Sequence, residues 1–325
     1  MKSRGILCSM VNAGTLLLTP AADALAQAYP AKPLRIIVPV AAGGNVDLVA
    51  RSVAQRLTAT LGQQVIVENR PGASSLVGTQ FVAKAPADGY TLLAIASTFV
   101  SAPSLIKNPG YDPVKDFAGI SLTCWLPQIL IVNPSVPVKS VKELIALAKA
   151  RPNELTIAHS GNGSTGHIAL ELFNRQAGTR MVQIPYKGNA PSLIDVIGGQ
   201  VVMMFDTIST SVQYVKTGKV RPLGVTSVKR SPLFPDVPTI AETLPGYEAA
   251  IFNGIIAPAG TPRDILAKLN AEIAKAVQQP ELRERFLAQG VELGASDTPE
   301  HFSDFIRSQV ARFSKLVQDV GIKPE

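Results

Sequence analysis

The 325-residue sequence is poor in cysteine, in aromatic residues and in long apolar runs. It has two cysteines, Cys8 and Cys124, so Cys-rich zinc sites are excluded. No run of 18 apolar residues follows Gln27, so no membrane-spanning helix is expected beyond that point. Aromatic residues make up 6%, and lysines and arginines are scattered singly. The basic stripe and stacking aromatics of nucleic-acid-binding proteins are therefore missing, and no nucleic-acid partner is expected.

The remaining composition is that of a globular protein. Hydrophobic residues are 46% and charged residues 17%, which excludes a disordered, highly charged chain. At roughly 150 residues per domain, the length predicts two α/β domains. The net charge of +7 gives a mild positive field that favours small anionic ligands.

Residues 1–26 have the three parts of a secretory signal peptide. Lys2 and Arg4 form a basic start, residues 6–18 are mostly apolar, and residues 24–26 are a small-x-small cleavage signature. We expect cleavage near Ala26, which leaves Cys124 without an intramolecular disulfide partner. The signal lacks twin arginines, so export of a folded protein carrying a cofactor is not expected.

Short apolar runs alternate with helical periodicity twice along the chain. Because such alternation is typical of parallel sheets, we expect two largely parallel sheets. The predicted strands are residues 34–38, 65–67, 91–95, 155–158, 181–184, 201–205 and 223–226. Three helices then begin at Pro262, Pro280 and Pro299 with no strand between them, and periodicity leaves open which domain they cover.

Two glycine-rich loops, residues 39–47 and 159–167, share one design. In each, an apolar strand leads through small residues into a helix. Such a loop presents backbone N–H groups at the positive end of a helix dipole, which suits a carboxylate or a phosphate. A tight strand-to-helix turn would have the same sequence, but two such loops at the starts of two α/β units favour ligand binding.

Two acidic residues stand close to these helix starts. Asp47 lies in a predicted first helical turn, where it can order the loop by accepting backbone N–H bonds or bind a ligand ammonium or hydroxyl group. Asp206 follows a predicted strand, where it can cap the next helix or make hydrogen bonds in a cleft. The pattern leaves both interpretations open.

Motifs for catalysis are absent or incomplete. Gly161-x-Gly163-x-x-Gly166 matches a dinucleotide fingerprint, but the next strand ends in Ile184-Pro185-Tyr186-Lys187, without the acidic residue that would hold a ribose. No Gly-x-Ser-x-Gly surrounds a serine, and the three histidines lack the His-x-x-x-His spacing. We therefore expect no cofactor, no metal and no enzymatic activity.

The loops lie in sequence blocks that resemble the extracytoplasmic substrate-binding proteins of tripartite tricarboxylate transporters, the Bug family. The blocks run in order through the chain at residues 35–39, 42–44 with Asp47, 67–73, 88–92, 111–113, 160–164, 185–188, 198–201, 204–206, 225–227 and 257–262. The sequence departs from the family pattern at Val40, where an aromatic residue is frequent, and at Asn45. These departures leave the identity of the ligand open.

The resemblance implies a two-domain α/β fold of the periplasmic-binding-protein type (type II-like), with the ligand cleft between the domains. The first domain would comprise residues 27–130 and 248–325 and take the three C-terminal helices, and the second would comprise residues 131–247. The resemblance further implies a periplasmic, monomeric protein that captures a small carboxylate metabolite and passes it to the permease subunits of a tripartite tricarboxylate transporter.

The predicted cleft residues come from both domains. They are Val40, Ala41, Ala42, Gly43, Gly44, Asn45, Asp47 and Thr98 on one side, and Ser160, Gly161, Asn162, Gly163, Ser164, Thr165, His167 and Asp206 on the other. The backbone N–H groups of Gly43, Gly44, Gly161 and Gly163 are expected to hold carboxylate oxygens, with hydrogen bonds from Asn45, Thr98, Asn162, Ser164 and Thr165. Two alternatives stay open: an exported α/β enzyme that uses one glycine-rich loop, and a binding domain used for sensing.

Overall fold

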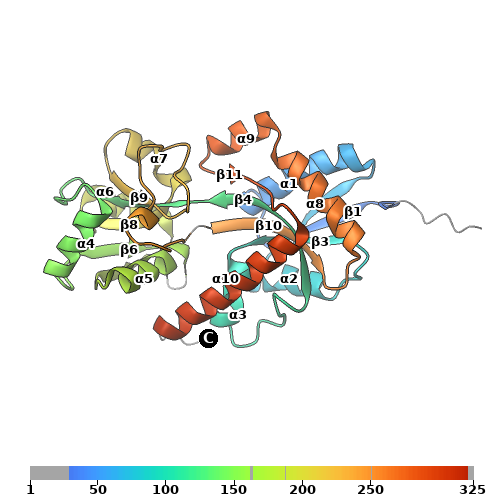
Figure 1. Cartoon of the computed structure of the whole chain (residues 1–325), viewed down its shortest axis with the longest axis horizontal. Helices are drawn as coiled ribbons and strands as arrows, with labels where there is room; N and C mark the ends of the chain where they lie inside the picture. Colours follow the sequence, from blue (N-terminus) through green and yellow to red (C-terminus); the bar gives the residue numbers. More distant parts are fainter. Residues whose placement is uncertain (1–28, 162–163, 187, 250, 321–325) are drawn as a thin grey trace, which may run out of the picture.

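The computed structural model describes residues 29–161, 164–186, 188–249 and 251–320, arranged as two α/β domains side by side (Figure 1). The first domain contains a sheet in the order β11-β4-β10-β3-β1-β2, and the second a sheet in the order β7-β6-β8-β5-β9. The strands of the first sheet are β1 (Leu34–Val38), β2 (Val65–Asn69), β3 (Thr91–Ala96), β4 (Phe117–Leu126), β10 (Ile251–Pro258) and β11 (Glu292–Leu293). Those of the second are β5 (Gln128–Val132), β6 (Thr156–His159), β7 (Val182–Pro185), β8 (Met203–Thr207) and β9 (Arg221–Val225).

Both sheets are mixed, which corrects the prediction of two largely parallel sheets. The predicted strands β1–β3 and β6–β8 are parallel within their sheets. However, β10 runs antiparallel to β3 and β4, and β5 runs antiparallel to β8 and β9. The reason is the path of the chain. The chain enters the second domain along β5 and returns to the first domain along β10, so both strands run away from the gap between the domains.

This topology brings the carboxyl ends of the parallel strands of both sheets together. The chain passes from β4 to β5 through Pro127 alone, so β4 points toward the second domain. The strands β1 and β3 share the direction of β4, because all of them oppose β10. In the second sheet β6, β7 and β8 oppose β5 and therefore run back toward the first domain. Ligands of open α/β sheets bind at the carboxyl ends of strands, so the topology directs two such edges at one cleft.

Helices cover both faces of each sheet. They are α1 (Asn45–Leu61), α2 (Leu76–Ala83), α3 (Thr98–Leu105), α4 (Val141–Ala150), α5 (Thr165–Ala177), α6 (Asn189–Gly198), α7 (Ile208–Lys216), α8 (Arg263–Val277), α9 (Pro280–Leu287) and α10 (Pro299–Val320). Successive residues of a strand pack into the cores on opposite faces of its sheet. Examples are Ile36 and Ile37 in β1, and Leu130 and Ile131 in β5. None of the described helices is long and apolar enough to cross a membrane.

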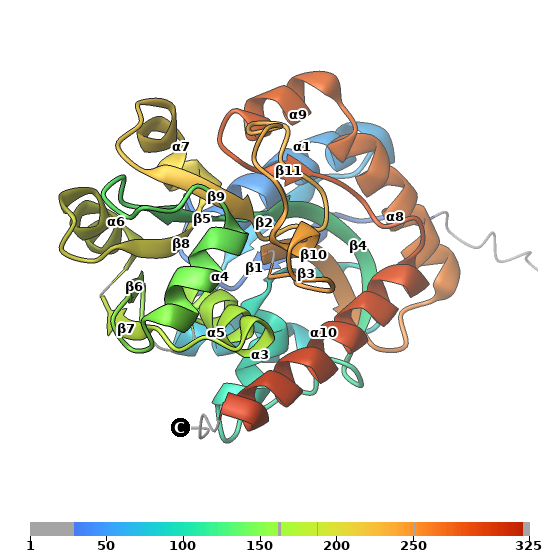
Figure 2. The ribbon, with the colours of Figure 1, turned by 60° about the vertical axis from the view of Figure 1, so that its left-hand side comes forward.

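The three C-terminal helices pack on the first sheet. Leu269 and Ile273 of α8 and Phe286 of α9 join the core beneath α1, and Phe302 of α10 joins the core on the opposite face. Figure 2 shows α10 running past α3 toward the side of the second domain that carries α5. The predicted boundary after residue 130 falls inside β5, because β4 and β5 were not recognised as strands.

Candidate functional site

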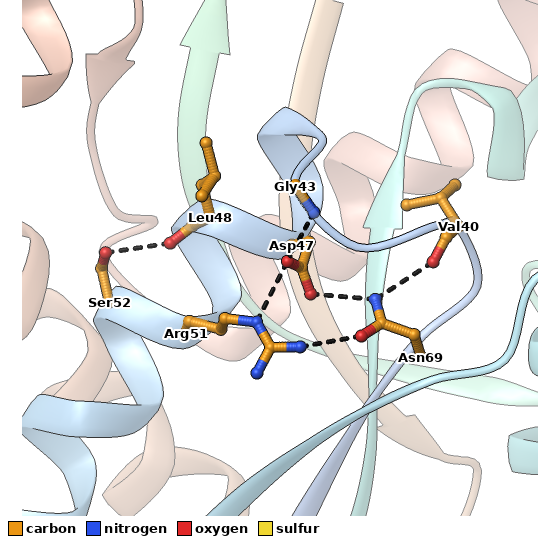
Figure 3. Close-up of polar contacts among 7 residues, drawn as sticks. All are labelled: Val40, Gly43, Asp47, Leu48, Arg51, Ser52 and Asn69. Carbon is orange, nitrogen blue, oxygen red and sulfur yellow. Dashed lines mark hydrogen bonds and ion pairs between the residues drawn. The ribbon is translucent and has the colours of Figure 1, made fainter.

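A buried carboxylate orders the first glycine-rich loop. One oxygen of Asp47 accepts hydrogen bonds from the Gly43 N–H at 2.9 Å and from Arg51 Nε at 3.0 Å, and the other accepts from Asn69 Nδ2 at 2.9 Å (Figure 3). Asn69, at the end of β2, also donates to the Val40 carbonyl at 3.1 Å. Burial alone would raise the pKa of Asp47, but the hydrogen bonds and the Arg51 charge lower it overall. Asp47 is therefore an ionised group that holds the loop, which is one of the two roles considered for it.

One predicted ligand donor of this loop, and the side-chain oxygen of a second predicted residue, are engaged within the protein. The Gly43 N–H is bonded to Asp47, so it does not offer the hydrogen bond expected of it toward a carboxylate. The Asn45 carbonyl oxygen accepts from Asn253 Nδ2 of β10 at 2.6 Å, which ties the start of α1 to the central strand of the sheet. The Gly43 N–H is thereby removed from the expected donor set, whereas the bond from Asn253 engages the acceptor oxygen of Asn45 and not its Nδ2 donor.

The exposed part of the loop leads into a helix without a capping side chain. Residues 41–44 are exposed, and α1 begins directly after Gly44 with no side-chain hydrogen bond to its first turn. Gly43 adopts φ +88°, which favours glycine, and a Cβ there would meet no atom within 4 Å. The first-turn N–H groups of α1, at the positive end of the helix dipole, are therefore suited to an external anion.

The second loop surrounds a pair of stacked histidines. His159 and His167 have ring centroids 4.6 Å apart, and His167 Nε2 lies 3.5 Å from Glu171 Oε1. Desolvation lowers the pKa of His159 despite its contact with the Gly161 carbonyl at 3.0 Å. The Ser164 hydroxyl accepts from the His167 N–H at 3.3 Å and so caps α5. His167 is 7% exposed, which places it within the wall behind the loop.

Two predicted residues of the second loop, Asn162 and Gly163, lie outside the described residues. Their neighbours Ser160 and Gly161 are half-buried, and Gly161 has φ +119°. The positive φ of Gly161, directly after β6, is a backbone conformation that favours glycine.

Asp206 connects the starts of two helices at the end of β8. It is fully buried, and it accepts from Asn189 Nδ2 of α6 at 2.7 Å and from the Thr210 hydroxyl of α7 at 2.5 Å. Burial raises the pKa of Asp206 to about 6, although the hydrogen bonds to Thr210, the Thr207 N–H, Asn189 and Ser211 act in the opposite direction. Asp206 therefore fixes α6 and α7 at the carboxyl edge of the second sheet.

Helix starts from both domains converge on this region. α1 and α3 follow β1 and β3, and α5, α6 and α7 follow β6, β7 and β8. Of these, α1, α3, α6 and α7 begin without a side-chain cap, whereas Ser164 caps α5. Opposed helix N-termini create a positive field without requiring lysine or arginine.

A cavity of about 130 Å³ opens beside these helix starts, between α3, α5 and α10. Its lining includes Thr98, Ser164 and Thr165, which were predicted as cleft residues. Sequence reasoning missed its other walls, which are Ser97, Val100, Ser101, Trp125, Ile168, Leu172, Glu248, Ala249, Ile251, Phe252, Gln309, Arg312, Phe313 and Leu316. These residues come from segments far apart in the chain. The apolar ones stand at helical or strand spacing, so in the sequence they indicate only packing.

The described residues do not form a metal site. Over residues 29–161, 164–186, 188–249 and 251–320, no group of three or more His, Cys, Asp or Glu side chains is arranged to hold a metal ion. Cys124 is buried and unpaired, and burial raises the pKa of its thiol to about 12. A thiol held in this state is a poor nucleophile.

Comparison with protein families gives a match over residues 49–322 to the model described as the tripartite tricarboxylate transporter family receptor. A relative, protein BugT of Bordetella pertussis, is 37% identical over 306 residues, covering 93% of this chain and 94% of the relative.

Two solved structures with bound acids also match. Rpa4515 of R. palustris with adipate has a TM-score of 0.72 and 36% identity, covering 91% of this chain and all of the other. MatC of Rhodopseudomonas palustris with bound malate has a TM-score of 0.68 and 32% identity, covering 89% of this chain and all of the other. A third neighbour, a ligand-free solute-binding protein of the same family from Polaromonas, has a TM-score of 0.82 and 28% identity, covering 90% of this chain and 99% of the other.

Proposed function

The chain belongs to the tripartite tricarboxylate transporter receptor family, and from this premise we propose that it is a periplasmic binding protein for a small carboxylate. It captures the acid between its two domains and delivers it unchanged to a membrane permease of the tripartite type. The protein is exported with cleavage near Ala26, and the two α/β domains act as a monomeric clamp.

The observation that carries this proposal is the convergence of helix N-termini at the carboxyl edges of both sheets. A carboxylate placed there receives backbone N–H groups of α1 and α3 from one side and of α5 to α7 from the other. The Asp47 and Asp206 networks hold these starts in place before the ligand arrives. The relatives with adipate and malate support an organic acid as the ligand class.

The arrangement also supports capture by closure. Each loop alone offers part of a binding site, so a carboxylate gains its full set of charge-assisted hydrogen bonds only when both domains contact it. The ligand therefore binds the closed state preferentially and shifts the population toward it. Asp47 and Asp206 hold the helix starts, and the rest of the predicted set, apart from the Gly43 N–H, remains our proposal for this contact.

Native mass spectrometry of protein freshly purified from a periplasmic fraction tests the proposal. We expect a retained metabolite that carries a carboxylate and that is recovered chemically unchanged after release. Calorimetric titration with that acid and with its neutral amide should give binding of the acid only. Retention of a neutral compound, or conversion of the bound acid to a product, would contradict the proposal.

A matched pair of threonine variants locates the site. Thr98 is exposed at the start of α3 beside the cavity, and Thr243 is exposed on the second domain away from the cleft. Thr98→Val should weaken binding of the retained acid, because a hydroxyl is removed from the cleft. Thr243→Val should leave affinity unchanged.

A further inference from the structure

The cavity between α3, α5 and α10, here called the α10 pocket, has mostly apolar walls. Trp125, Ile168, Leu172, Phe313 and Leu316 line it, and each is only half-buried in this structure. Half-buried apolar side chains around one hollow favour an apolar occupant, because filling the hollow removes their surface from water.

Aromatic packing holds the first-domain wall of the pocket in place. The Trp125 ring makes edge-to-face contacts with Phe305 at 5.3 Å and with Phe252 at 6.2 Å. The Ser97 hydroxyl accepts from the Phe252 N–H at 2.8 Å and so ties the start of α3 to β10. A wall held in this way binds without first having to be ordered.

The pocket is continuous with the proposed carboxylate site. Thr98 begins α3, and Ser164 and Thr165 begin α5, and all three line the pocket as well. A ligand whose carboxylate lies at these helix starts therefore has its remaining atoms next to the apolar walls.

The two charged residues on the pocket wall form an ion pair, so their charges neutralise each other. Arg312 of α10 lies 3.6 Å from Glu248, which belongs to the segment that leads back to β10. A second carboxylate on the ligand would have to compete with Glu248 for Arg312, at a partly buried position where a surplus negative charge is costly. This pairing disfavours dicarboxylates that extend into the pocket.

The volume limits the size of the apolar part. The pocket measures about 130 Å³. A protein cavity of about 150 Å³ with apolar walls accepts one benzene molecule. The space thus suits one six-membered ring or an aliphatic chain of similar volume.

We propose that the ligand is a monocarboxylate with an apolar body of about one ring, held with its carboxylate at the helix starts and its body in the α10 pocket. This inference rests on the proposed function and names the substrate class for the same cleft. It distinguishes this chain from the two relatives whose structures hold malate and adipate, which are both dicarboxylates.

Calorimetric titration of the mature exported protein with 3-phenylpropionate and with succinate tests the proposal. We expect 3-phenylpropionate to bind at least about tenfold more tightly, since even a single methylene in an apolar pocket changes affinity about tenfold or more. Ile168→Trp and Leu316→Trp fill the pocket from opposite domains, and each should weaken 3-phenylpropionate binding by about tenfold or more. Ile194→Trp is the control, because Ile194 lies on α6 away from the pocket and is 65% exposed.

A second measurement locates the ring without any variant. Trp125 is the single tryptophan of the sequence and forms part of the pocket wall, so its emission should shift when 3-phenylpropionate binds. Circular dichroism melting establishes that each variant is folded, and either filling variant alone suffices for the test.

The outcomes separate the two proposals. Tighter binding of succinate, unchanged 3-phenylpropionate affinity in a folded filling variant, or binding without a Trp125 signal would overturn the assignment of the pocket while carboxylate binding stands. Failure of both acids and of every co-purified carboxylate to bind would overturn the proposed function, and the pocket assignment with it.

Discussion

Replacement of Asp206 by asparagine should remove a pH-dependent loss of stability from the second domain. Asp206 is fully buried, and burial raises the pKa of its carboxyl from the ordinary value of 3.8 to about 6. The folded protein therefore keeps a proton on Asp206 at pH values where the unfolded chain has already released it. Stability must then fall as the pH rises through this window, because folding favours the protonated form.

The size of the effect follows from the two pKa values. A change from 3.8 to about 6 corresponds to about 3 kcal/mol, at about 1.4 kcal/mol for each tenfold change in the equilibrium constant. About 2 kcal/mol of this falls between about pH 4.5 and about pH 7.5, a range suited to urea unfolding. This loss of unfolding free energy is absent well below pH 3.8 and complete above pH 6 to 7.

The assay compares urea unfolding of wild type and Asp206→Asn across this range, followed by circular dichroism. The wild-type free energy of unfolding, minus that of the variant, should decrease by about 2 kcal/mol from the acidic to the neutral end. Taking the difference cancels other titrating groups, such as His159, whose pKa is lowered by desolvation. Asp304→Asn is the control, since Asp304 is an exposed carboxyl on α10.

A difference that stays constant or increases with pH would refute the reasoning. It would mean that the hydrogen bonds from Asn189 and Thr210 outweigh the desolvation of the Asp206 carboxylate.

Four further predictions concern the clamp and its export. Asp47→Asn removes the charged acceptor that holds the first loop, so ligand affinity in titration calorimetry should fall by about tenfold, while circular dichroism shows an intact fold. A hydrogen bond to a charged group contributes about 1.5–3 kcal/mol, which is consistent with this loss. Unchanged affinity would remove this loop from the site. In Gly290→Ala the new Cβ would lie 2.7 Å from Ser209 N across the gap between the domains, so the domains should part and the radius of gyration in small-angle scattering should increase; an unchanged radius would contradict this contact. The cognate acid should decrease the radius of gyration of the wild type and its neutral amide should not, whereas tight binding with an identical profile would favour a rigid, preformed pocket. Intact mass of the periplasmic protein should correspond to cleavage after Ala26, and an unprocessed chain would disprove export.

The sequence predicted the elements whose signals are local. Each predicted strand lies within two or three residues of an observed one, because an apolar run flanked by turns is visible without knowing its partner. The strands β4, β5 and β10 escaped detection, since Ser121, Thr123 and Asn253 interrupt their apolar runs and β5 follows β4 after one proline. Their antiparallel direction depends on the crossing of the chain between domains, which has no local signature.

The site was predictable to the level of its loops but not of its hydrogen bonds. Glycines followed by a helical pattern marked the helix starts, and the position of Asp47 in a first turn suggested that it orders the loop. The bond between Asn45 and Asn253 joins residues 208 positions apart, so no spacing rule could show that the Asn45 oxygen is engaged. Asp206 is a mixed case: its bond to Thr210, four residues on, fits the considered role of holding the next helix, whereas its bond to Asn189 at the start of α6 had no local signal.

The contrast between loops that are visible in the sequence and contacts that are not bears on how a binding protein of this kind acquires its specificity. On our proposal, helix starts recognise the carboxylate through the backbone. Any sequence with suitable glycines supplies such a backbone, and it does not select for the rest of the ligand. On our proposal, the rest of the ligand contacts Trp125 of β4, Ile168 of α5, and Leu316 and the paired Arg312 of α10, which are three separate segments. In the sequence, the apolar residues among these look like ordinary core positions. The residues that would select the ligand are therefore ones that the sequence pattern assigns only to packing. A change of ligand then requires substitutions in α5 and α10, and the glycine-rich loops can stay as they are.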